Sequence, residues 1–90
     1  MARTSQEEQI MTMQEAENDL IEEVGLALRE GAQSLRIRQS ALAEKIGKSQ
    51  SHVSLALSGE QNMTLKSVAA LAWACGLKVS ISLEGFVDGR

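Results

Sequence analysis

The chain offers few residues that could perform covalent or metal chemistry. It has one cysteine, Cys75, and one histidine, His52, so neither an internal disulfide nor a closed zinc site of about four ligands can form. His52 has no carboxylate at triad-like spacing, and there is no glycine-rich phosphate loop. Cys75 falls on the apolar face of an expected helix, which is typical of a small core residue. The sequence therefore predicts neither an enzyme nor a bound cofactor or metal.

Charge is distributed unevenly along the chain, although the formal net charge is only −3. Residues 1–30 contain eight acidic and two basic residues, whereas residues 31–80 contain six basic and two acidic residues. Exposed charges are screened beyond about 8 Å at physiological salt, so a ligand responds to the local patch. The basic part of the chain can therefore attract phosphate even though the whole chain is acidic.

The length of 90 residues suits a single domain. A domain this small is marginally stable without a disulfide, a metal or a second subunit, and the first two are excluded above. A homodimer is therefore expected. Neither a run of about 20 apolar residues nor an apolar signal segment occurs, so we expect a soluble, cytoplasmic protein without a membrane partner.

Apolar residues recur at helical spacing through most of the chain. The first expected helix covers about residues 8–33, with a bend or break near Asn18 or Gly25. Its apolar stripe consists of Ile10, Met13, Leu20, Val24 and Leu28. Acidic residues stand between the members of this stripe, so the helix is expected to be amphipathic.

Three shorter helices are expected at 39–46, 50–58 and 65–75. Ser49 and Thr64 are suited to cap the starts of the second and third of these. The glycines that end the three helices are Gly47, Gly59 and Gly76, because glycine adopts a left-handed conformation at little cost. The inner face of the last helix is expected to consist of Leu65, Val68, Leu71, Ala72 and Cys75, with Trp73 off this stripe.

The period of the apolar residues changes from 3.6 to 2 at residues 77–84, where the sequence reads LKVSISLE. Strict alternation predicts a half-buried strand. A single strand leaves its backbone groups unpaired, and the chain has no second strand pattern. The strand is therefore expected to pair with its own copy in a dimer.

Residues 37–58, which read IRQSALAEKIGKSQSHVSLALS, have the pattern of two helices joined by a glycine turn. Ala43 is small enough for the helices to cross closely, and Gly47 makes the turn. The wedge between them is expected to be filled by Leu42, Ile46 and Val53. Together with the following helix, TLKSVAALAWACGL, the stretch from about 28 to 77 resembles the Cro/phage-repressor-type (XRE-like) helix-turn-helix family.

This resemblance implies a mainly α, lambda-repressor-like domain of four to five helices that binds double-stranded operator DNA. Its implied base-contacting residues are Gln50, Ser51, His52 and Leu55, of which Gln50 can pair with adenine in a bidentate manner. Its implied phosphate-contacting residues are Arg38, Gln39, Lys45, Lys48, Ser49, Ser58, Gln61 and Asn62. An ordinary solvated surface is an alternative role for His52 and the two lysines. Arg38 replaces the usual Ser or Thr cap of the family, and Arg36 stands where the family often has Gly.

A domain of this type followed directly by an alternating strand is similar to antitoxins of bacterial toxin–antitoxin modules, the HigA- and HipB-like group. This second resemblance implies a repressor of its own operon whose acidic N-terminal helix binds a toxin protein. The implied organisation is an acidic helical extension at 1–24, the DNA-binding domain at 25–76, a dimerisation strand at 77–84 and a tail at 85–90. Residues implied at the dimer interface are Trp73, Val79, Ile81 and Leu83.

Two other functions are compatible with the sequence. The same core occurs in phage repressors and in stand-alone repressors without a toxin partner. A protein-binding module could instead use the acidic N-terminal helix as its working surface. The polar, reachable side chains of Gln50, Ser51, His52 and Ser54 favour DNA binding over that module.

Overall fold

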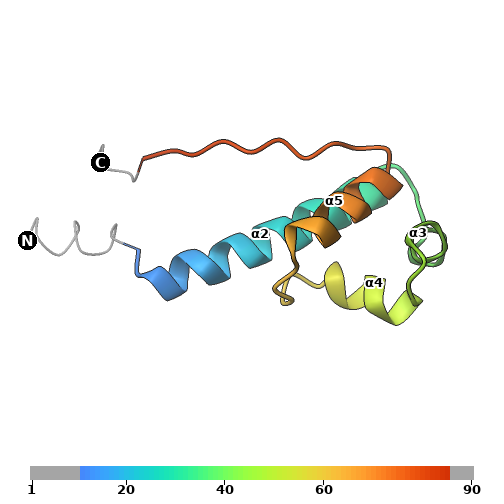
Figure 1. Ribbon diagram of the computed structural model, residues 1–90, viewed down its shortest axis with the longest axis horizontal. Helices are drawn as coiled ribbons and strands as arrows, with labels where there is room; N and C mark the ends of the chain where they lie inside the picture. Colours follow the sequence, from blue (N-terminus) through green and yellow to red (C-terminus); the bar gives the residue numbers. More distant parts are fainter. Residues whose placement is uncertain (1–10, 86–90) are drawn as a thin grey trace, which may run out of the picture.

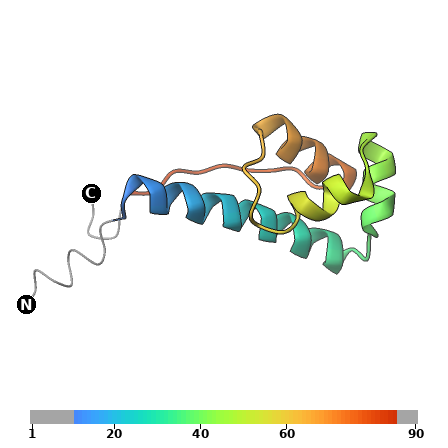
Figure 2. The same cartoon turned by 90° about the horizontal axis from the view of Figure 1, so that it is seen from below.

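The computed structural model describes residues 11–85 and is mainly helical, which confirms the predicted fold class at this level. The helices are α2 (Met13–Ser34), α3 (Gln39–Ile46), α4 (Gln50–Ala56) and α5 (Leu65–Ala74). The long helix α2 runs the length of the molecule, and the other three gather around its carboxyl-terminal half (Figure 1, Figure 2). No strand forms within residues 11–85, and no helix there has the length and apolar character needed to cross a membrane.

The start of α2 is determined by a local capping box at Thr12. The Glu15 backbone N–H donates to Thr12 Oγ1 over 3.1 Å, and the Thr12 backbone N–H donates to Glu15 Oε1 over 3.0 Å. The first helix was expected to include Met11 and Thr12, and this is wrong because neither residue is helical. The expected helical residues 8–10, including Ile10, lie outside the described residues. The Thr-x-x-Glu spacing in the sequence was the signal for the correct boundary.

The helix α2 is continuous through Asn18 and Gly25, so the expected bend or break is absent. Gly25 instead permits a close backbone contact with the turn that follows α4. A Cβ atom built on Gly25 would lie 2.6 Å from Gly59 Cα and 2.7 Å from Gly59 N, which is closer than real side chains approach. The absence of a side chain at Gly25 therefore allows the two backbones to touch. Packing at this point offsets the low helix propensity of glycine, so α2 continues through it.

Three helices end with the same backbone pattern, in which a residue of positive φ follows the helix and the next N–H returns to a carbonyl five residues earlier. The hydrogen bonds are Ile37 to Ala32 and Lys48 to Ala43, both 2.9 Å, and Leu77 to Ala72, 2.8 Å. Gly47 (φ 71°) and Gly76 (φ 77°) occupy two of the positive-φ positions, as predicted. Arg36 (φ 58°) occupies the third, although this conformation disfavours side chains with a Cβ.

The buried core is drawn from all four helices and confirms most of the predicted core positions. Its members are Leu28, Ala32, Leu42, Ala43, Val53, Ala56, Leu57, Val68, Leu71, Ala72, Ala74 and Cys75, with Val24, Ile37, Ile46 and Met63 packed against them. Leu65 is an incorrect prediction, because it is 79% exposed. It is the first residue of α5, and side chains of a helix lean toward its amino terminus, so at this position there is no preceding helical turn for Leu65 to cover.

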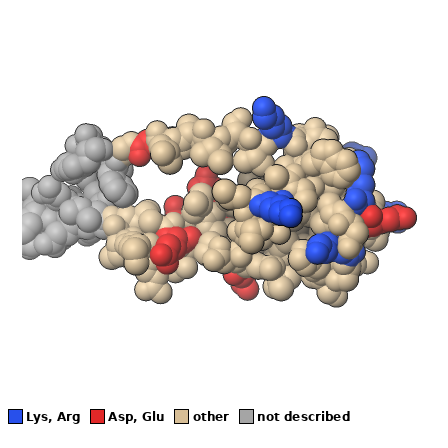
Figure 3. Space-filling model, in the orientation of Figure 1, with Lys and Arg blue, Asp and Glu red and all other residues tan. Residues whose placement is uncertain are grey.

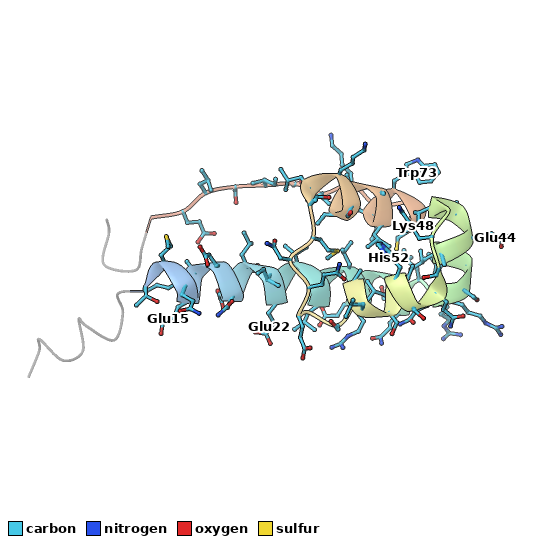
Figure 4. The ribbon with its side chains drawn as sticks, turned by 60° about the horizontal axis from the view of Figure 1, so that its bottom comes forward. Glu15, Glu22, Glu44, Lys48, His52 and Trp73 are labelled. Carbon is cyan, nitrogen blue, oxygen red and sulfur yellow. The ribbon has the colours of Figure 1, made fainter. Side chains whose placement is uncertain are left out.

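The amino-terminal half of α2 lies outside this core. Met13 and Leu20, which belong to the predicted apolar stripe, are 77% and 61% exposed. They share a helix face with Val24, and Glu15 and Glu22 lie on the opposite face. Figure 4 shows Glu15 and Glu22 pointing away from the carboxyl-terminal segment, so the Met13–Leu20 face is turned toward that segment.

The carboxyl-terminal segment, residues 77–85, is extended and runs back alongside α2 without forming a ladder (Figure 1). Figure 3 shows open space between this segment and the amino-terminal half of α2. Its first residue is tied to the fold, because the Leu77 N–H closes the end of α5 and the Leu77 side chain lies near Gly31. The apolar side chains beyond it, those of Val79, Ile81 and Leu83, are exposed in the single chain.

Candidate nucleic-acid interface

The helix α4 is held by packing on one side and exposed on the other. Its start is capped as predicted, because Ser49 Oγ accepts a hydrogen bond of 3.0 Å from the His52 backbone N–H. Val53 and Ala56 are fully buried against the core. The remaining directions on the helix carry the exposed side chains of Gln50, Ser51, Ser54 and Leu55.

Successive residues of a helix are about 100° apart, so these four side chains form one contiguous face. We call this set, Gln50, Ser51, Ser54 and Leu55, the α4 face. Three of the four predicted base-contacting residues belong to it. His52 is half-buried and lies on the side of α4 that faces α5 (Figure 4), at the border of the α4 face. Ser54 is absent from the predicted set, although its spacing from the buried Val53 and Ala56 puts it near the centre of the face.

Basic and acidic side chains are separated on the molecular surface. Figure 3 shows Lys and Arg side chains over the end of the molecule that carries α3, α4 and α5, and Asp and Glu side chains mainly over α2. The exposed basic residues after α2 are Arg36, Arg38, Lys45, Lys48, Lys66 and Lys78, and α2 itself exposes Arg29. Glu44 on α3 is an acidic residue within the basic end (Figure 4). The uneven charge along the sequence thus becomes an uneven charge in space.

Two basic residues of the two-helix unit are exposed. Arg38 is the N-cap of α3, and Lys48 lies in the turn between α3 and α4. Arg38 makes no side-chain cap hydrogen bond, so α3 begins without the usual Ser or Thr cap. Gln39, the first residue of α3, is half-buried, and Asn62 is exposed in the loop before α5.

Lys45 is engaged within the fold. Its Nζ donates a hydrogen bond of 3.4 Å to the Ala74 carbonyl at the end of α5 and lies 5.5 Å from the centroid of the Trp73 ring. Both contacts are favourable, because the last carbonyls of a helix and the face of an indole ring attract a cation. A phosphate contact by Lys45 would compete with these interactions.

Ser58 closes the turn after α4. Its hydroxyl donates to the Leu55 carbonyl over 2.7 Å and accepts from the Glu60 backbone N–H over 3.1 Å. A serine hydroxyl has one proton, so this rotamer leaves none for a phosphate oxygen. The structure therefore assigns Ser58 to the turn in the free chain.

Gln61 is half-buried, and its Oε1 atom has no hydrogen-bond partner within the described residues. The neighbouring surface hollow is lined by Asn18, Ile21, Glu22, Gly59 and Glu60. Two carboxylates beside this loop oppose the approach of a phosphate group. Gln61 is thus less favourably placed for a phosphate contact than the residues around the turn between α3 and α4.

The residues that could support other chemistry do not converge. Within residues 11–85 no three His, Cys, Asp or Glu side chains are close enough to hold a metal ion. Cys75 is buried, as predicted for a core residue. Burial raises the pKa of the Cys75 thiol, partly offset by the positive charge of Lys45. A raised pKa lowers the thiolate fraction at neutral pH and with it the nucleophilicity of the sulfur.

The positive φ at Arg36 leads to a stability prediction. Replacing Arg36 with glycine is expected to increase the free energy of unfolding by about 1 kcal/mol, because glycine adopts this conformation without the Cβ clash. In a domain of this size the unfolding midpoint should rise by about 5 °C, measured by circular dichroism. Arg38→Gly is the matched control, since the φ of Arg38 is −75° and no strain is relieved there. An equal rise in both variants would contradict the role of strain at Arg36.

Comparisons with known proteins assign no family to this chain. No protein-family model matches the sequence, and neither the curated proteins nor the solved structures contain a significant match. The features of the molecule that bear on function are the α4 face, the basic residues near it and the exposed apolar surfaces of the single chain.

Proposed function

We propose that this chain is a sequence-specific DNA-binding transcriptional regulator, a repressor of bacterial or phage type. In this function α3 and α4 form a lambda-repressor-like helix-turn-helix, and the α4 face enters the major groove. The observation that carries the proposal is that α4 is packed on one side and presents a contiguous, mostly polar, uncharged face on the other. A side chain must be exposed and polar in this way to reach hydrogen-bonding groups on base edges.

The charge distribution supports the same orientation. The exposed basic residues lie at the end of the molecule that carries the α4 face, where they can neutralise DNA phosphates (Figure 3). Acidic residues such as Glu15 and Glu22 lie on α2, toward the other end of the molecule (Figure 4). A carboxylate near the DNA backbone would cost affinity, so the acidic half of α2 extends away from the DNA in the proposed complex.

The functional unit is proposed to be a homodimer in which residues 77–84 pair across a two-fold axis. The extended segment that carries Ile81 and Leu83 runs alongside the amino-terminal half of α2 with open space between them, and Met13, Leu20, Ile81 and Leu83 are all exposed in the single chain (Figure 1, Figure 3). The extended backbone also has no ladder partner within residues 11–85, and such an edge invites pairing with another chain. Trp73, which is 62% exposed, adds a large aromatic surface. A dimer of this kind spaces two α4 faces to read half-sites about 34 Å apart.

A finer role as the antitoxin of a toxin–antitoxin module is part of the proposal. The exposed acidic amino-terminal half of α2 favours it, because a helix that leaves the core with both acidic and apolar side chains suits a basic protein partner. Co-expression with the product of an adjacent reading frame tests this role: an antitoxin restores bacterial growth that the partner alone arrests. Growth that stays arrested would contradict the antitoxin role, and the proposal would then be a stand-alone repressor.

DNA binding is tested by measuring affinity for operator and random duplexes as a function of salt. Gln50→Ala is expected to weaken operator binding about tenfold and to relax one base position, because Gln50 is a base-reading residue in this model of recognition. Lys48→Ala is expected to weaken binding to all DNA sequences alike, and to reduce the slope of log affinity against log salt concentration by about one unit. Unchanged operator affinity in Gln50→Ala would contradict the assigned α4 face, and salt-independent binding would contradict DNA recognition altogether.

A further inference from the structure

The α4 face contains one apolar residue, Leu55, which is 53% exposed although the other three members of the face are polar. Its position is held firmly. The Leu55 carbonyl accepts hydrogen bonds from both Ser58 Oγ (2.7 Å) and the Ser58 backbone N–H (3.2 Å). Val53 and Ala56, on either side of it, are fully buried. The backbone at Leu55 is therefore held in place, and about half of the Leu55 side chain is accessible to a ligand.

The composition of α4 limits which bases it can read. The helix, QSHVSLA, carries no Lys, Arg, Asp or Glu. Arginine and lysine are the side chains that recognise guanine, and aspartate and glutamate accept a hydrogen bond from cytosine. The α4 face instead offers an amide, two hydroxyls and an isobutyl group. An amide matches adenine, and an apolar group matches the 5-methyl group of thymine.

We propose that α4 reads a half-site of A·T base pairs in which Leu55 packs against a thymine methyl group and thereby sets specificity. This inference rests on the proposed DNA-binding function and adds the class of sequence that the site accepts. Leu55 lies one helical turn after Ser51 on the same face, so it reaches a base step beyond the one contacted from the start of α4. Thymine is distinguished from cytosine and from both purines by this methyl group in the major groove.

The test begins with selection of bound duplexes from a random pool by the full chain. Each thymine in the selected half-site is then replaced in turn by uracil, which removes only the 5-methyl group, and affinity is measured by fluorescence anisotropy. At one position uracil is expected to weaken binding about fourfold per half-site, the value of burying one methyl group. Leu55→Ala should bind thymine and uracil duplexes equally, whereas Leu55→Met should retain a preference for thymine.

Leu65→Ala is the matched control, because Leu65 is also an exposed leucine but lies on α5, outside the α4 face. It should discriminate between thymine and uracil as the unmodified chain does. Selected sites rich in G·C pairs, or a uracil effect that persists in Leu55→Ala, would overturn the role of Leu55 while leaving DNA binding intact. If no duplex is bound in a salt-dependent manner, the proposed function fails together with this inference.

Discussion

Replacing Gly25 with alanine is expected to lower the free energy of unfolding by about 3 kcal/mol, because the added methyl group collides with backbone. Its Cβ would lie 2.6 Å from Gly59 Cα and 3.3 Å from the Ala56 carbonyl oxygen. Neither atom can rotate away as the end of a flexible side chain can. The unfolding midpoint should fall by about 15 °C, measured by thermal circular dichroism.

Gly31→Ala is the matched control on the same helix. There the added Cβ would meet only Leu77 Cδ1, at 2.9 Å, which is the end of a flexible side chain. Alanine is favoured over glycine within a helix by about 0.5–1 kcal/mol, so this variant should be unchanged or more stable. Similar midpoints for the two variants would refute the close contact between α2 and the turn after α4.

Removing residues 78–90 is expected to convert the protein into a folded monomer whose operator affinity is lower by about 100-fold or more. The loss arises because two linked half-site contacts become independent binding events. Leu77 is kept in this variant, since its N–H closes the end of α5 and its side chain lies near Gly31. Sedimentation equilibrium gives the oligomeric state, and circular dichroism checks that the helices are intact.

A pair of point variants separates the two sides of the same segment. Ile81→Lys puts a charge on the apolar side and is expected to dissociate the dimer, whereas Ser82→Lys changes the alternate, polar side and should leave the dimer intact. Both residues are exposed in the single chain, so neither variant should disturb the helical core.

A truncated protein that stayed a tight dimer and bound the operator normally would show that the segment does not mediate dimerisation.

Local chemistry made a large part of the fold predictable from the sequence. Ser49 and Thr64 cap α4 and α5 as expected, since a cap depends only on the next three residues. Gly47 and Gly76 end their helices for the same kind of local reason. The helix periods also identified most of the core, and the charge of each segment is visible without a structure. The Thr12 capping box was equally local and could have been found.

Contacts between distant parts of the chain were decided only by the tertiary structure. Gly25 looked like a helix breaker, and only the packing of Gly59 against it explains the glycine. Lys45 looked available to phosphate, but its neighbours Trp73 and Ala74 come from another helix. Such contacts depend on how the helices cross, and no spacing within one segment encodes that geometry.

The candidate site divides in the same way. The sequence by itself identified a polar helix beside a basic segment, because residue type and charge are properties of the chain. The tertiary structure decided which of those residues are reachable: it buries Val53 and Ala56, turns His52 to the border, and leaves Ser54 and Leu55 on the exposed face. The physical reason is that a helix presents all directions at once, and only the packing of its neighbours selects the face that remains open.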